Sequence, residues 1–187
     1  VWSAWDYIGE ACIGDWTYHS YKGLPLLAGQ GMIDITGKPL ASMYFMQIVW
    51  GLRKKPFIGV RPVNHAKEEP SKGAWQFTNA IDSWSWQGYE GKKATVEVYA
   101  DAVAVRLSLN GKTVATKLVK KYKTQFKLPY EPGTLLAEAL DANGKIISKY
   151  SLPSAKCRVT RFPIRSYMIW SMQKQVSFLQ KQSQRWH

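Results

Sequence analysis

Hydrophobic and polar positions alternate with the period of a β-strand through the middle of the chain. From Val103 to Leu109 every second residue is Val or Leu, which indicates a half-buried strand. Asn110-Gly111 follows and supplies the residue types that a type I′ hairpin turn prefers. Short runs of the same kind predict further strands at residues 57–63, 74–79, 94–99, 113–117, 124–128, 134–140 and 145–150. The pattern predicts an immunoglobulin-like β-sandwich over residues 57–152.

A helical pattern precedes these strands, within residues 1–56. Pro39 suits the first turn of a helix and Gly51 suits its end. A short apolar run at residues 32–35 comes just before it. The residues at helical spacing are Leu40, Met43, Tyr44, Gln47 and Ile48. We therefore expect one helix at residues 40–50.

Composition narrows the class of protein. The 187 residues are 45% hydrophobic, which excludes a wholly disordered chain. Two Cys and three His support neither a disulfide scaffold nor a zinc site, so we expect no metal and no cofactor. No apolar run reaches the roughly eighteen residues that a membrane span needs. The first residue is Val1 and no signal-peptide pattern follows, so we interpret the chain as part of a longer protein and assign it no compartment.

The net charge of +13 is unevenly distributed. Residues 153–187 contain Lys and Arg but no Asp or Glu, and they show no sustained period. Two interpretations remain for them, a disordered basic tail or an out-of-frame reading of a following domain. The combination of basic charge and many aromatic residues suggests two functions, sugar binding by ring stacking and nucleic-acid binding. The chain has no recognised nucleic-acid-binding motif, so nucleic acid is not an expected partner.

Two clusters of residues could carry chemistry. Residues 2–10 contain Trp2, Trp5, Asp6 and Glu10, and aromatic rings beside carboxylates suit a carbohydrate pocket. An aromatic strand with solvated acids is the alternative. In the second cluster, Trp84 and Trp86 would share one strand face, either as a sugar-binding platform or as large aromatics of the sandwich core.

The order of these motifs resembles a known family, glycoside hydrolase family 2 of the bacterial β-galactosidase type. Residues 2–10 resemble the last strand of the catalytic barrel. Residues 31–39, with Tyr44 and Trp50, resemble the loop and final helix that close the barrel. Four further segments resemble the immunoglobulin-like domain that follows the barrel: residues 84–91, 96–99, 107–112 and 129–135.

The resemblance implies a mainly β fragment in which the last β/α unit of a TIM barrel, residues 1–56, precedes a sandwich, residues 57–152. Trp2 would line the sugar site and Asp6 would be the acid at the strand end, with Trp5 and Glu10 beside them. The two catalytic glutamates of a retaining glycosidase would lie upstream of Val1, so we assign no catalytic residue and expect the chain alone to be inactive. The implied partner of the parent enzyme is a β-galactoside-like carbohydrate.

A second interpretation stays open from the residues themselves. Residues 57–152 could be a carbohydrate-binding module or a purely structural sandwich, and Trp84 and Trp86 would distinguish these alternatives. The oligomeric state is not predicted by the sequence.

Overall fold

The computed structural model describes residues 3–6, 31–65 and 77–155 of the chain. The chain divides into two compact units, Val1–Ala155 and Lys156–His187, and the described residues all belong to the first. The predicted basic tail therefore lies outside the described residues. The boundary predicted between residues 56 and 57 stays a prediction.

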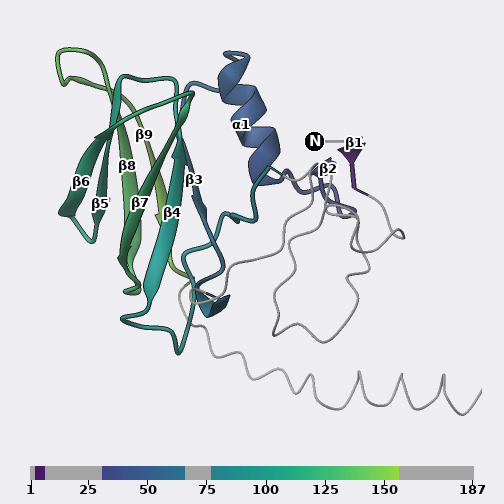
Figure 1. The fold of residues 1–187 in the computed structure, drawn as a ribbon, viewed down its shortest axis with the longest axis horizontal. Helices are drawn as coiled ribbons and strands as arrows, with labels where there is room; N and C mark the ends of the chain where they lie inside the picture. Colours follow the sequence, from purple (N-terminus) through teal and green to yellow (C-terminus); the bar gives the residue numbers. More distant parts are fainter. Residues whose placement is uncertain (1–2, 7–30, 66–76, 156–187) are drawn as a thin grey trace, which may run out of the picture. The chain divides into compact units, whose positions relative to one another are not determined.

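Two antiparallel sheets form a sandwich in the first unit (Figure 1). The three-stranded sheet has the order β3-β4-β7, and the four-stranded sheet has the order β6-β5-β8-β9. This arrangement confirms the prediction of a mainly β fold with a sandwich. The strands are β3 (Phe57–Val60), β4 (Lys93–Tyr99), β5 (Ala104–Leu109), β6 (Lys112–Leu118), β7 (Lys123–Pro129), β8 (Thr134–Leu140) and β9 (Ile146–Pro153).

The core lies between the two sheets and follows from strand alternation. Val96 and Val98 of β4 face inward with Phe126 of β7, and Val105 and Leu107 of β5 face them from the other sheet. All five side chains are fully or almost fully buried. Burying a large apolar side chain contributes about 1.5–3 kcal/mol, so this layer supplies most of the drive for the sandwich to form.

Two predicted strands differ from the structure. The first ends at Val60, because Pro62 cannot donate a ladder hydrogen bond, and the chain then enters a 3₁₀ turn, η1 (Val63–His65). The second was expected at residues 74–79. Residues 74–76 lie outside the described residues, and 77–79 form no strand. Instead, Ile81 makes an isolated antiparallel bridge to Val60, with N–H···O distances of 2.8 and 2.9 Å.

Two hairpin turns have the same backbone form but different residues. Asn110 and Gly111 join β5 to β6 with φ values of 50° and 80°, as the sequence predicts. Lys121 and Tyr122 join β6 to β7 with φ values of 50° and 63°, closed by reciprocal backbone hydrogen bonds between Lys120 and Lys123. Lys and Tyr rarely adopt a left-handed backbone conformation, so the second turn is strained. For the same reason the sequence does not predict it.

A short parallel pair precedes the sandwich. β1 (Ser3–Trp5) lies beside β2 (Gly31–Ile33), and Ser3 pairs with Gly31. A side chain at Gly31 would overlap the backbone of Asp6, so glycine is required for this close approach.

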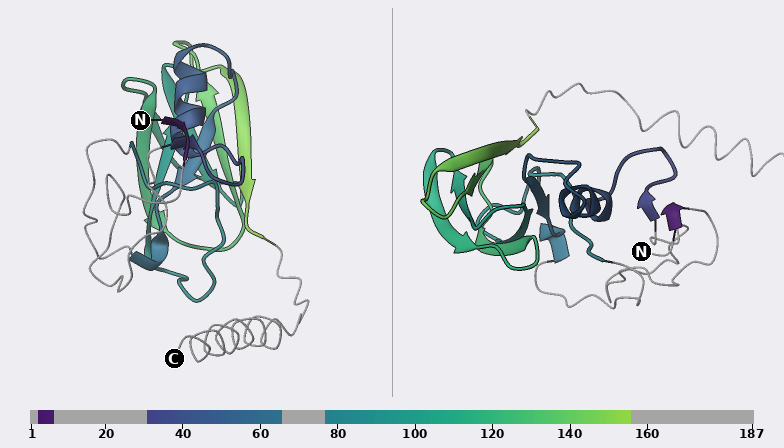
Figure 2. Two further views of the ribbon diagram at one scale, coloured as in Figure 1. Left: turned by 90° about the vertical axis from the view of Figure 1, so that its right-hand side faces the viewer. Right: turned by 90° about the horizontal axis from the view of Figure 1, so that it is seen from above.

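The predicted helix follows as α1 (Ala41–Val49), within one residue of the expected bounds, and Gly51 leaves it with a φ of 70°. Seen from above, α1 lies against the outer side of the three-stranded sheet (Figure 2). Its contacts there are aromatic. The Tyr44 ring stacks on Phe57 at 4.4 Å between centroids, and Phe45 meets Tyr99 edge-on at 5.4 Å. Within the described residues, no helix is long and apolar enough to cross a membrane.

Candidate functional site

The carboxyl end of β1 carries the described part of the predicted sugar site. Asp6 follows the strand directly, and its backbone N–H donates to the Ile33 carbonyl at 2.7 Å, which extends the parallel pairing by one step. Because side chains alternate along a strand, Trp5 is 56% exposed while Asp6 is only 6% exposed. The exposed Trp5 indole offers a flat apolar surface of the kind that packs against sugar rings.

The loop after β2 lies beside this end of β1. A side chain at Gly37 would come within 3.9 Å of the Trp5 ring. Asp34 accepts hydrogen bonds from the Thr36 hydroxyl, the Thr36 N–H and the Lys38 N–H at 2.6 to 2.9 Å. The hydroxyl bond first, then the Lys38 N–H, lowers the pKa of Asp34 below its usual value. Asp34 therefore stabilises the turn next to Trp5 rather than serving as a proton donor.

Of the four predicted sugar contacts, Trp5 and Asp6 lie in the described residues at the end of β1, where the Trp5 side chain is exposed and the Asp6 side chain is buried. Trp2 and Glu10 lie outside the described residues, so their places in a sugar site stay predictions. The described residues contain no group of three or more His, Cys, Asp or Glu side chains that could hold a metal ion.

Trp84 belongs to the core, which corrects its assignment to a sugar platform. Its side chain is fully buried, and its Nε1–H donates to the Glu131 carbonyl at 2.9 Å. The Tyr130 ring meets it edge-on at 4.9 Å, and the Tyr130 hydroxyl accepts from the Trp86 backbone N–H at 2.9 Å. The physical reason is that residues 83–86 form no strand, so Trp84 and Trp86 do not share an open strand face. Trp84 is therefore a core residue, as the alternative interpretation predicts.

Trp86 is only partly buried and packs on the edge of the same core. Its Nε1–H is buried and has no hydrogen-bond partner among the described residues. One ring without Trp84 beside it does not make a two-ring platform. Trp86 therefore remains a candidate for a single sugar contact only.

The outer face of the three-stranded sheet holds a buried charge cluster that the sequence did not predict. Glu97 of β4 is fully buried on this face, beside Tyr99 and Thr78. Its Oε1 accepts from Arg61 Nε at 2.9 Å, and its Oε2 pairs with Lys123 Nζ at 2.8 Å. Oε2 also accepts from the Tyr99 hydroxyl at 2.7 Å and from the Thr78 hydroxyl at 3.0 Å. The carboxylate is thus satisfied on both oxygens, as a buried charge requires.

Electrostatics in this cluster follow from the pairing. Burial alone raises the pKa of Glu97, but Lys123, Tyr99 and Arg61 together hold that pKa below its ordinary value. Burial, and then the negative charge of Glu97, raises the pKa of Tyr99. Both groups therefore keep one protonation state near neutrality, with Glu97 charged and Tyr99 neutral. The cluster positions cations and does not exchange protons.

We compared the chain with protein-family models and with solved structures, and both comparisons found matches. A domain of unknown function (DUF4982) matches residues 91–148, which cover most of β4 to β9. A solved glycosyl hydrolase family 2 (GH2) member from Bacteroides cellulosilyticus is 30% identical, with a TM-score of 0.65, over 83% of this chain and 21% of that chain. A GH2 member from Bacteroides cellulosilyticus DSM 14838 is 27% identical, with a TM-score of 0.56, over 67% of this chain and 17% of that chain.

A beta-glycosidase from Bacteroides vulgatus shares the fold at 24% identity and a TM-score of 0.54, over 83% of this chain and 16% of that chain. Among curated proteins no match was found. The chain spans about a fifth of the length of the solved proteins it matches. In sequence and fold, it resembles a portion of GH2 glycoside hydrolases.

Proposed function

We propose that the chain is a C-terminal part of a GH2 glycoside hydrolase of β-galactosidase type. It would contain the last β/α unit of the catalytic barrel and the immunoglobulin-like domain that follows it. One observation supports the proposal: 83% of this chain matches a portion of a GH2 member at 30% identity with a TM-score of 0.65.

Trp5 and Asp6 are the described residues that we assign to the sugar pocket, together with Trp2 and Glu10. In β/α barrels the active site gathers at the carboxyl ends of the strands, which is where Trp5 and Asp6 lie on β1. The nucleophile and the acid/base carboxylates, about 5–5.5 Å apart in retaining glycosidases, come from upstream strands in this proposal. The chain by itself would hold one side of the sugar without hydrolysing its bond.

We propose that the sandwich braces α1 rather than binding sugar itself, and specific contacts favour this role. Lys38, after β2, pairs with Asp82 at 2.7 Å. Arg53, after α1, lies over the rings of Tyr44 and Tyr150 at 5.1 and 5.4 Å. The burial of Trp84 removes half of the predicted sugar platform. These contacts support a domain that fixes the end of the barrel.

The test uses the enzyme encoded by the complete gene. Its upstream frame should encode an Asn-Glu pair and a second Glu on barrel strands. In that enzyme Asp6→Asn should lower kcat/KM on a chromogenic β-galactoside by roughly ten- to hundredfold, because a hydrogen bond to a charged group is lost. Asp101→Asn, an exposed acid in the turn after β4, is the matched control and should leave kcat/KM unchanged.

Three outcomes would overturn the proposal. The first is an upstream frame without barrel strands. The second is an Asp6→Asn enzyme as active as the control. The third is hydrolysis of the β-galactoside by the pure 187-residue chain. Oligosaccharide titration of the chain tests the bracing role, since binding that disappears with Trp86→Ala would show a sugar-binding sandwich instead.

A further inference from the structure

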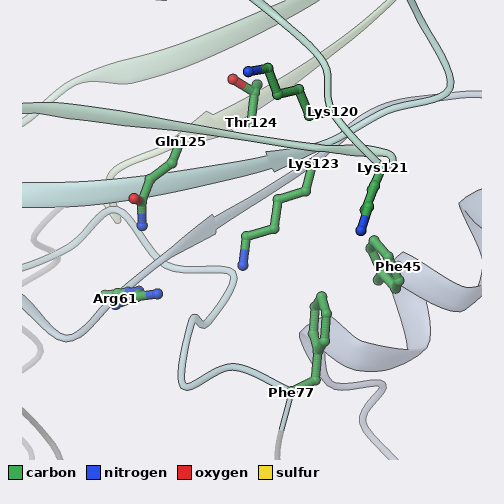
Figure 3. A pocket seen from close by; sticks show the side chains of 8 residues that line it. All are labelled: Phe45, Arg61, Phe77, Lys120, Lys121, Lys123, Thr124 and Gln125. Atoms are coloured by element: carbon green, nitrogen blue, oxygen red, sulfur yellow. The ribbon is translucent and has the colours of Figure 1, made fainter.

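A pocket of about 500 Å³ lies on the outer side of the three-stranded sheet, next to the Glu97 cluster. Pockets of 300–1,000 Å³ are typical of small-molecule sites. Residues from four parts of the chain meet here, and they lie far from Trp5 and Asp6 in the sequence. The lining residues are Phe45, Arg61, Phe77, Lys120, Lys121, Lys123, Thr124 and Gln125 (Figure 3).

The pocket has a cationic side and an aromatic side. In Figure 3 the Lys123 ammonium extends into the space between Arg61 and Phe77, and the Gln125 amide lies near Arg61. The rings of Phe45 and Phe77 lie on the other side, 4.5 Å apart between centroids, with Lys121 directed toward Phe45. A ligand that fits both sides carries a negative group and an apolar face.

Glu97 holds the cationic side in place. Its ion pairs fix the ends of Arg61 and Lys123, which are 35% and 29% exposed, at the pocket wall. Glu97 uses one of the three N–H donors of Lys123. Cations already ordered by a buried partner lose little conformational entropy when an anion binds, so the buried carboxylate favours binding beside it.

Unbalanced positive charge remains after this pairing. Among the described residues, Glu97 pairs with Arg61 and Lys123, and the pocket lining adds Lys120 and Lys121. Lys120 and Lys121 are exposed, and in the described part of the chain neither ammonium has an acidic partner. Residues 112–129 contain six Lys and no Asp or Glu. The local field therefore attracts anions.

The strained turn places these lysines at the pocket. Lys121 and Tyr122 both have positive φ, although neither is Gly, Asn or Asp. Such strain persists only where the surrounding structure enforces it. Here the turn directs Lys120 and Lys121 to one rim of the pocket while Lys123 starts β7.

We propose that this pocket binds a saccharide that carries an anionic group, a uronate carboxylate or a sulfate. The anionic group meets Lys123 and Arg61, Lys121 adds its positive charge from the aromatic side, and the C–H face of the sugar ring contacts Phe45 and Phe77. The choice of a sugar rests on the proposed glycosidase function, whereas the choice of an anion rests on the pocket alone. The site is separate from the end of β1 and holds glycan without hydrolysing it.

The test is calorimetric titration of the 187-residue chain at low salt with digalacturonate, a galactose disaccharide sulfate, neutral galactobiose and inorganic sulfate. We expect both acidic sugars to bind at least tenfold more tightly than galactobiose and than inorganic sulfate. Their affinity should fall as salt rises, because salt screens charge.

Lys121→Gln should weaken binding of the acidic sugars roughly five- to tenfold by removing one charge at the pocket. Lys127→Gln is the matched control, since Lys127 is an exposed lysine on β7 that does not line the pocket. Both substitutions remove one positive charge from exposed side chains, and thermal unfolding checks that both variants remain folded.

Equal binding of galactobiose and digalacturonate would overturn the proposal. So would an effect of Lys127→Gln as large as that of Lys121→Gln, which would indicate general electrostatic attraction. Inorganic sulfate that binds as tightly as the acidic sugars would overturn the sugar component. Failure here leaves the Asp6→Asn result untouched, so the two proposals fail independently.

Discussion

The two faces of the three-stranded sheet are both buried, but by opposite chemistry. On the inner face, Val96 and Val98 belong to an apolar core that includes Val105 and Leu107 of the opposite sheet. On the outer face of the same strand, Tyr99 packs against α1, and the neighbouring Glu97 carboxylate is neutralised by Arg61 and Lys123. The inner face of β4 is thus apolar, whereas its outer face carries a buried carboxylate that is paired with two cations.

The difference shows what each kind of burial needs. An apolar face needs only the correct period and volume, so it tolerates conservative changes. An ionic face needs cations and hydroxyls from several elements in fixed places, and a lost partner leaves a buried charge uncompensated. The following predictions separate these two dependences, from the largest expected effect to the smallest.

Removing a large ring from the inner face should have the greatest effect. Phe126→Ala should lower the free energy of unfolding by about 3–5 kcal/mol, because it leaves a cavity in the core. Denaturant unfolding followed by fluorescence measures this. Val114→Ala, on the exposed strand β6, is the control and should cost less than about 1 kcal/mol. A similar loss for both variants would mean that the two sheets are not packed as described.

On the outer face, Glu97→Ala should cost about 3 kcal/mol, because Arg61 and Lys123 lose their buried partner. Glu138→Ala is the matched comparison, since Glu138 pairs with Arg106 at 2.7 Å and both side chains are only partly buried. It should cost less than Glu97→Ala, because water reaches the charge that is left behind. Equal losses in denaturant unfolding would show that the outer face is no more demanding than the surface.

Acid should weaken the outer face before the inner face. The folded-state pKa of Glu97 is lowered from its ordinary 4.5, so its ion pairs stabilise the fold above that pH. This stability is lost as pH falls below 4.5 through the folded-state pKa. Glu97→Gln should therefore flatten the acid limb of a plot of unfolding free energy against pH. An unchanged acid limb in that variant would contradict the assignment.

The smallest effect concerns the turn that leads into the outer face. Lys121→Asn with Tyr122→Gly gives this turn the residue types of its unstrained counterpart, Asn110-Gly111. The double variant should gain about 1 kcal/mol in unfolding free energy, because left-handed strain is relieved. If thermal and denaturant unfolding show no gain, the turn is not strained.

Local sequence signals predict the elements whose conformation is decided locally. The Asn110-Gly111 turn, the helix ended by Gly51 and the alternating strand from Val103 to Leu109 all form as their residue types dictate. The Lys121-Tyr122 turn does not follow from its residues, because pairing of the flanking residues enforces it. Local pattern therefore explains most strands, but only one of these two turns.

The candidate sites depended on partners distant in the sequence. The sequence does not distinguish Trp84 from Trp86, because the contacts that place Trp84 in the core come from the distant Tyr130 and Glu131. The sequence pattern indicates a solvent-facing position for Glu97, because the partners that bury it, such as Arg61 and Lys123, are distant in the sequence. Asp6 and Trp5 were assigned through resemblance to a family, and their burial and exposure came from the structure.

The edge strand β6 affects whether copies of the chain associate with one another. Among the described residues it lies at the end of the order β6-β5-β8-β9, with no strand paired along its outer edge, and its Leu118 is 65% exposed. This edge could therefore pair with a second copy. Lys112 and Lys117 lie on this edge and repel an identical strand at low ionic strength. High salt should therefore promote self-association, which light scattering would detect. The lysines of one hairpin would then serve both ligand capture and protection against aggregation.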